Sequence, residues 1–155
     1  MYEKLIALEQ NMNLQLRLVA VDKTRFDVSS AHQGRLYLVS KAAEPFNIAR
    51  ANHYCRLSGG YLVELDDSQE YQFVFGLASA IGGANTFWTG ANDIDNEGTF
   101  VFYNNKKPAA ELAWSGGQPD NAGGFEDCVE IRLDFGGLND WICDQSGKFV
   151  CEVPI

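Results

Sequence analysis

Four cysteines constrain the fold of this chain more than any other feature of its sequence; they are Cys55, Cys128, Cys143 and Cys151. None of them has the CxxC spacing that favours a zinc site, so we expect disulfides rather than thiolate metal ligands. The sequence alone leaves all three pairings open. Disulfides persist in oxidising compartments, which indicates a secreted or extracellular protein. The alternative is a cytosolic protein with four buried free thiols.

Length and charge narrow the class of protein. The 155 residues suffice for one domain with a core, and a hydrophobic content of 46% argues against disorder. The net charge of -9 suits a cation and argues against a nucleic-acid partner, because phosphates are neutralised by Lys and Arg. No run approaches the roughly 18 apolar residues that span a bilayer, so we expect no membrane insertion.

Residues 1–24 are predicted to form a helix, because no glycine or proline precedes Gly34 and apolar residues recur at spacings of three and four. The apolar positions are Leu5, Leu8, Met12 and Val19. Gln15 and Asp22 interrupt the repeat. Two interpretations remain open: a coiled-coil neck that joins copies of the chain, or an amphipathic helix that lies on its own domain.

From residue 25 onward the pattern is mixed. Short strands are predicted over 25–28 and 35–40, followed by a helix that Pro45 opens and Gly59-Gly60 ends. A second helix is capped by Asp67 and ends at residues 81–83. Only short strands and turn-rich segments follow; the strands are expected at 87–89, 99–103, 128–133, 141–143 and 148–152. This order predicts an α+β domain over 25–155.

Several motifs then occur in a characteristic order: "GGYLVEL", "FWTGAND", "NEGTF", "QPD", "EDCVEI", "LNDWIC" and "KFVCE". Together they make the chain from about Arg35 to Ile155 resemble the C-type lectin-like domain. The resemblance implies two helices and short antiparallel sheets with a long calcium-binding loop region. It also implies the disulfides Cys55–Cys151 and Cys128–Cys143, and a carbohydrate-recognition domain over 25–155.

The resemblance also implies a calcium site for sugar binding. The residues that match the family's ligands are Gln118, Asp120, Glu126, Asn139 and Asp140. Calcium takes six to eight oxygens from carboxylates, amides and carbonyls, which is what these side chains offer. A cis peptide before Pro119, as in the lectins that this chain resembles, would aim both flanking side chains at one ion. The alternative is that these are ordinary turn residues.

An auxiliary calcium site is predicted beside the first, sharing Glu126. Its candidate ligands are Asp93, Glu97, Asn121 and Asp127. Asn121 stands where the fuller version of this site usually has an acid, so one charge is lost and binding should be weaker. A solvated acidic turn around Gly98 is the alternative for Asp93 and Glu97.

The expected sugar follows from the order of the amide Gln118 and the acid Asp120 on either side of Pro119. Gln-Pro-Asp resembles the galactose-type members of the family, so terminal galactose or N-acetylgalactosamine is expected. Phe125 is the aromatic residue in the loop, and it would either stack on the sugar or pack under the loop. Leu138 departs from the tryptophan that the family commonly has there, and Trp141 is expected to take over its packing.

The sequence therefore predicts a calcium-dependent lectin. The alternative is a lectin-like domain that binds a protein or another non-sugar ligand, since fold does not fix function. An enzyme is not expected, because His32 and His53 lie outside the carboxylate motifs and neither a Gly-x-Ser-x-Gly elbow nor a phosphate loop occurs.

Overall fold

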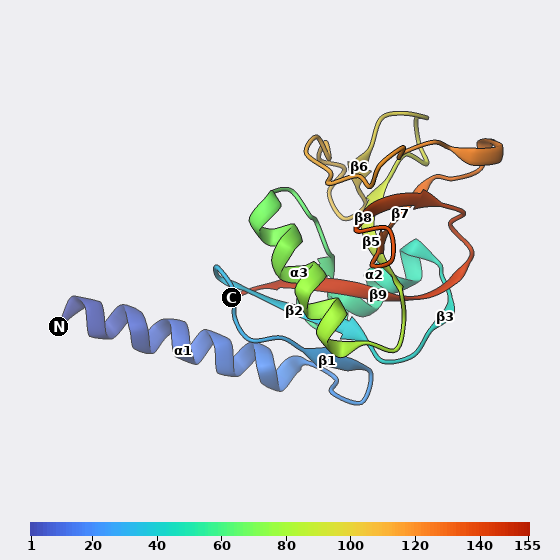
Figure 1. Cartoon of the computed structure of the whole chain (residues 1–155). Coiled ribbons are helices and arrows are strands. Elements are labelled where there is room, and N and C mark those ends of the chain that lie inside the picture. The colour runs from blue at the N-terminus through green and yellow to red at the C-terminus, as the bar shows by residue number, and fades with distance from the viewer.

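The computed structural model describes residues 1–155 and shows a helix, α1, that projects from an α+β domain (Figure 1). In chain order the elements are α1 (Tyr2–Ala20), β1 (Phe26–Val28), β2 (Arg35–Ser40), β3 (Glu44–Pro45), α2 (Ile48–Leu57), β4 (Tyr61–Leu62), α3 (Ser68–Ile81), β5 (Thr86–Asn92), β6 (Val101–Phe102), the 3-10 turn η1 (Ala122–Gly124), β7 (Cys128–Arg132), β8 (Gly137–Trp141) and β9 (Ser146–Pro154). All three predicted helices are present, although α1 ends at Ala20 rather than at residue 24.

The strands form one mixed sheet in the order β1-β2-β9-β5-β7-β8. β9 is its centre, antiparallel to β2, β3 and β4 but parallel to β5, with Phe87 opposite Lys148. The pairing is thus mostly antiparallel, as the family resemblance implies, with this one parallel pair in addition. A parallel pair needs a long connection, and the chain between β5 and β9 supplies it with the loops, β7 and β8.

Local sequence explains where the helices begin. The side chain of Asp67 accepts a hydrogen bond from the Glu70 backbone N–H at 2.7 Å, the predicted cap of α3. α2 is capped by Asn47, which accepts from the Arg50 N–H at 3.0 Å. Pro45 does not open α2 as expected, because it pairs with Ser146 in β3, two residues before the cap.

The disulfides join Cys55 to Cys151 and Cys128 to Cys143, the pairs that the family resemblance implies. The first ties α2 to the central strand β9 across a sequence separation of 96 residues. On the chain-entropy model a loop of that length stabilises the folded state by about 4 to 5 kcal/mol. The second ties β7 to the segment after β8 and so braces the strands that carry the loop region.

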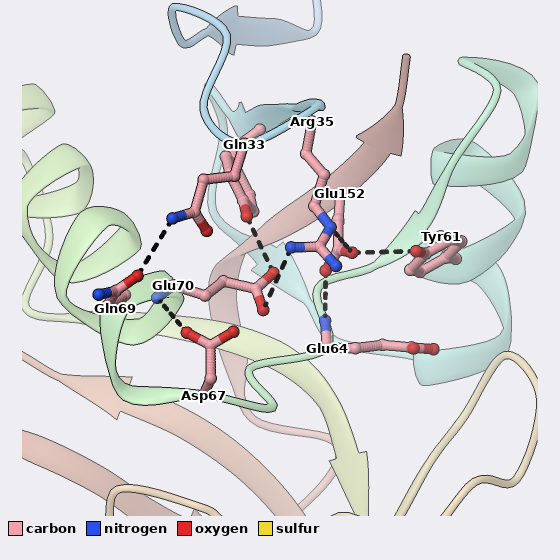
Figure 2. Close-up of polar contacts among 9 residues, drawn as sticks. Gln33, Arg35, Tyr61, Glu64, Asp67, Gln69, Glu70 and Glu152 are labelled. Atoms are coloured by element: carbon pink, nitrogen blue, oxygen red, sulfur yellow. Dashed lines mark hydrogen bonds and ion pairs between the residues drawn. The ribbon is translucent and has the colours of Figure 1, made fainter.

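A buried polar cluster joins α3 to the sheet; we call it the Arg35 cluster (Figure 2). It consists of Arg35, Tyr37, Tyr61, Glu70 and Glu152. The Arg35 Nε lies 3.1 Å from Glu152 Oε2, and the same guanidinium reaches Glu70 Oε2 at 3.9 Å. Tyr37 donates to Glu70 and Tyr61 donates to Glu152, each at 2.9 Å. Burial raises the pKa of Glu70 to about 9, so at neutral pH it is uncharged and Arg35 balances Glu152.

α1 has two apolar faces with different surroundings. Leu14 and Leu18 pack against the core that contains Val21, and so hold the C-terminal half of the helix on its own domain. Leu8 and Met12 belong to a different face and are 60% and 64% exposed. The whole predicted stripe (Leu5, Leu8, Met12 and Val19) is exposed, and no residue of α1 is fully buried. None of the helices combines the length and hydrophobicity needed to cross a bilayer.

Candidate functional site

The loops between the end of β5 and the start of β7 lie at the end of the domain away from α1 (Figure 1). The peptide between Gln118 and Pro119 is cis. Asp140, in β8, accepts from the backbone N–H groups of Asp120 and Asn121 at 3.1 and 2.7 Å. These two bonds fasten the Gln-Pro-Asp turn to the sheet, so the turn's side chains are positioned by a strand rather than left on a free loop.

Side-chain oxygens converge on the terminal amide of Gln118. The amide atom that faces them lies 3.0 Å from Asn139 Oδ1, 2.8 Å from Asp140 Oδ1 and 3.2 Å from Asp120 Oδ1. If this atom is the nitrogen, it donates hydrogen bonds to these oxygens. In the other orientation of the amide it is the oxygen, and four side-chain oxygens then face one another. Convergent oxygens without a hydrogen-bond donor are the surroundings that a hard cation requires.

Glu126 completes this group from the end of the loop. Its carboxylate accepts from the Ala122 N–H at 2.9 Å, and its oxygens lie within 4.8 Å of those of Asp120 and Asp140. Glu126 is 3% exposed and Asp140 is 1% exposed. Burial, and then the neighbouring Asp120, raises the pKa of Glu126 to about 7, and burial also raises the pKa of Asp140.

No Lys or Arg forms an ion pair with Asp120, Glu126 or Asp140. Apart from the Gln118 amide, these three acids have only backbone N–H partners, which leaves an excess of negative potential. The five residues predicted as ligands thus lie together, and their chemistry fits calcium.

The residues of the predicted auxiliary site form a second group. Carboxylate oxygens of Asp93, Glu97 and Asp127 lie within 4.8 Å of one another. Asp93 is 2% exposed; its Oδ2 accepts from the Gly98 N–H at 2.9 Å while its Oδ1 has no partner. Burial raises the pKa of both Asp93 and Asp127. The unpaired buried oxygen gives this cluster a feature that a merely solvated turn would lack.

Asn121 connects the two groups. Its Nδ2 donates to Glu97 Oε1 at 2.8 Å, and its Oδ1 accepts from the Glu126 N–H at 3.1 Å. The residue has a left-handed backbone conformation, with φ of 44°, which asparagine tolerates better than most residues. The amide therefore orders the loop between the two acidic clusters.

The aromatic and apolar residues around the site resolve two open expectations. Phe125 is 73% exposed, so it does not pack under the loop and its ring is accessible from solvent. Leu138 is itself fully buried in the core, whereas Trp141 is 37% exposed. The expectation that Trp141 replaces the packing of the family's tryptophan is wrong, because Leu138 fills that place.

Sequence reasoning missed one residue next to the site. Glu130 is 3% exposed and accepts a hydrogen bond from Asn139 Nδ2 at 3.0 Å. The signal was present in the strand "CVEIR", where one acid stands among apolar residues, but a strand acid is usually exposed.

Comparison with known proteins places the chain in a family. Residues 44–153 match the model of the Lectin C-type domain. Perlucin of Haliotis laevigata is 35% identical over 123 residues, which cover 78% of this chain and 79% of perlucin. The fold, the disulfides and the family match define a C-type lectin carbohydrate-recognition domain. The chain belongs to the C-type lectin domain family, which is a family of lectins and not of enzymes.

Solved structures agree with this assignment. The C-type lectin CEL-I from Cucumaria echinata superposes with a TM-score of 0.70 at 26% identity, covering 84% of this chain and 96% of CEL-I. The trimeric structure of the Kupffer cell C-type lectin receptor Clec4f superposes with a TM-score of 0.72 at 24% identity, covering 96% of this chain and 95% of that one. The second alignment extends into α1.

Proposed function

We propose that this lectin domain binds terminal galactose or N-acetylgalactosamine through a calcium ion held by Gln118, Asp120, Glu126, Asn139 and Asp140. The observation that carries the proposal is the convergence of oxygens on the Gln118 amide, 2.8 to 3.2 Å away, with no basic side chain among them. An external cation removes the repulsion among the three acids, and their formal charge leaves the loaded site close to neutral.

Bound calcium would supply coordination positions for two vicinal hydroxyl oxygens of a sugar. The protein side chains would make the remaining contacts to the sugar hydroxyls. Carboxylates such as Asp120 and Glu126 only accept, so they take the hydroxyl hydrogens; amides such as Gln118 donate to the remaining lone pairs. The order of acid and amide across Pro119 therefore selects the arrangement of the diol. The exposed ring of Phe125 is suited to cover the apolar face of galactose.

Retention on galactose-agarose tests this proposal directly. We expect the chain to be retained in calcium, eluted by a chelator, and not retained when Asp120→Ala removes one ligand. Lys107→Ala, an exposed change outside the acidic clusters, is the matched control and should bind like the wild type. A single open site should be weak, with a dissociation constant on the order of 1 mM. Retention that is unaffected by chelator or by Asp120→Ala would refute the calcium mechanism.

A lectin-like domain for a protein or other non-sugar ligand is the second candidate. Thermal unfolding and retention on galactose-agarose together distinguish the two candidate functions. Calcium should raise the Tm because it binds only the ordered loop. A calcium-dependent rise in Tm without sugar retention would favour the second candidate.

The auxiliary cluster (Asp93, Glu97 and Asp127, beside Asn121) is proposed as a weaker calcium site that shares Glu126.

We also propose that the protein acts outside the cell, as its disulfides favour, and that α1 joins copies of the chain. The exposed stripe on α1 is separate from the face that Leu14 and Leu18 dock on the domain. Clec4f, whose alignment extends into α1, is described as trimeric. Several weak sites on one assembly would give useful affinity for multivalent glycans.

Sedimentation tests the role of α1. Leu8→Glu with Met12→Glu should yield a monomer, because two charges enter the seam between helices. Gln10→Glu with Asn13→Glu adds the same charge at exposed positions outside the stripe and should leave the oligomer intact. A wild-type chain that is already monomeric, or two pairs of changes with equal effects, would contradict this role.

A further inference from the structure

The side-chain amide of Asn139 lies between Glu130, which accepts a hydrogen bond from it, and the Gln118 amide of the proposed calcium site. It lies in β8, at one end of the sheet order, where it is opposite Glu130 of β7 in the register of the two antiparallel strands. Directly opposed residues on neighbouring strands interact through their side chains. Toward the loop, its Oδ1 lies 3.0 Å from the Gln118 amide, within the proposed calcium site.

An amide can present either its oxygen or its nitrogen to a given side, but a carboxylate can only accept. Glu130 Oε2 accepts from Asn139 Nδ2 at 3.0 Å. Both residues are 3% exposed, so water does not offer either group an alternative partner of comparable strength. With the nitrogen committed to Glu130, the oxygen of Asn139 must face the loop. The amide carries two N–H bonds, so one remains for a ligand.

Glu130 is also held in place by Arg132, at the same carboxylate oxygen that accepts from Asn139. The Arg132 guanidinium lies 3.6 Å from Glu130 Oε2 and makes two hydrogen bonds to Asp134, at 3.0 and 2.8 Å. The Arg132 guanidinium also lies over the Phe135 ring, 3.8 Å from its centroid. The buried carboxylate thus has a fixed counter-charge, which lets it remain an acceptor inside the sheet.

We infer that Glu130 is a positioning residue, which orients the Asn139 amide so that its oxygen is available to the cation and one N–H to the sugar. This inference rests on the proposed calcium site. Outer partners that orient a metal ligand are typically worth about 10- to 100-fold in metal affinity. Glu130 does not touch the ion or the sugar in this arrangement; it acts through Asn139.

A pair of substitutions separates orientation from charge. Asn139→Asp adds a negative charge at the site, which by charge count alone should strengthen calcium binding. If Glu130 sets the orientation, the new carboxylate is forced against the Glu130 carboxylate, and calcium affinity should fall by about tenfold or more. Adding Glu130→Gln restores a donor opposite the new acid, so the double variant should return to within about threefold of the wild type.

Two further variants complete the experiment. Glu130→Leu removes the acceptor at similar volume and should cost about tenfold in calcium affinity. Asp144→Asn removes an exposed acid that contacts neither Arg132 nor Asn139, and should leave the affinity unchanged. Calcium affinity is measured by calorimetry on the full chain, and thermal unfolding in chelator verifies that each variant is folded.

A measurement without metal keeps this inference separate from the proposed function. In calcium-free protein, the Asn139 side-chain amide protons should exchange with solvent more slowly in the wild type than in Glu130→Leu, as followed by NMR. Equal exchange in the two proteins would overturn the inference, and so would tighter calcium binding by Asn139→Asp. If the wild type bound no calcium but the exchange difference held, the proposed function would fail while the orientation by Glu130 stood.

Discussion

The molecule contains two clusters of carboxylates, one in the Arg35 cluster and one in the loop, and their negative charge is balanced in different ways. In the Arg35 cluster, Glu152 lies 3.1 Å from a guanidinium, Glu70 keeps its proton, and two tyrosine hydroxyls donate to them (Figure 2). In the loop, Asp120, Glu126 and Asp140 have backbone N–H partners but no cationic side chain.

The difference separates a group of acids that serves the fold from one that serves a ligand. The Arg35 cluster carries its own counter-charge, so it joins α3 to the sheet without help from solution. The loop group leaves its charge unbalanced, which costs stability in the absence of a cation and creates affinity when one is present. Buried charge without an internal partner is therefore the better indicator of a binding site in this chain.

Replacing Arg35, the cationic side chain of the Arg35 cluster, should have the largest effect on stability. Arg35→Met leaves Glu152 buried with only Tyr61 and the Glu64 N–H as partners. We expect a loss of about 2 to 4 kcal/mol in the free energy of unfolding, because an uncompensated buried charge remains. That corresponds to a fall in Tm of roughly 5 to 15 °C. Chemical denaturation at neutral pH, in chelator, measures it.

An exposed ion pair is the control for this prediction. Lys106→Met breaks a pair with Asp95 whose side chains are 52% and 66% exposed, and it should cost less than about 1 kcal/mol. Similar losses of stability in the two variants would show that the Arg35 guanidinium does not balance a buried charge. The rise in Tm from calcium at the proposed sugar-binding site should survive in both, since neither change touches Asp120, Glu126 or Asp140.

A smaller effect is expected from Glu64, whose side chain extends away from Arg35 (Figure 2). Its Oε2 has no partner, and burial, followed by the charge of Glu152, raises its pKa to about 7. A folded-state pKa above the unfolded value of 4.5 gives a contribution that is present below pH 4.5 and lost as the pH rises through 7. Glu64→Gln should therefore be more stable than the wild type at pH 8, by about 2 kcal/mol, but not at pH 5.

Unfolding in chelator at both pH values measures this difference. The loop acids titrate alike in the two proteins, so they cancel in the comparison. A stability gap between wild type and Glu64→Gln that does not change with pH would contradict the assignment of Glu64 as the titrating group.

The sequence predicted the elements whose signals are local. Asp67 caps α3 because cap and N–H are three residues apart, and the motifs around Pro119 bring the expected side chains together because a short turn positions them. α1 shows where such signals end. The helix packs on its domain through Leu14 and Leu18, whereas the predicted stripe is exposed, and its role as a coiled-coil neck stays a prediction. Spacing identifies an apolar stripe but not the surface that covers it.

The contacts that sequence reasoning missed depend on which strands pair and in which register. Arg35 and Glu152 meet because β2 and β9 are neighbours, and Glu130 meets Asn139 because β7 and β8 are in register. A charged residue in a strand is normally assigned to the exposed face, since burying a charge is costly without a partner. The partner here lies on another strand, so only the fold reveals it.

Exchanging acid and amide across Pro119 should have the smallest effect on stability and still change the sugar that is bound. Gln118→Glu with Asp120→Asn keeps the formal charge and the number of oxygens, so calcium affinity should be nearly unchanged. The sense of the hydrogen bonds is reversed, so galactose meets a donor where it offers a donor. We expect the ratio of galactose to mannose inhibition constants to shift by roughly tenfold toward mannose, about 1.4 kcal/mol. If calcium affinity is retained and this ratio does not move, the Gln-Pro-Asp turn does not select the sugar, and recognition of galactose must come from elsewhere in the loop, with the exposed Phe125 ring as the next residue to change.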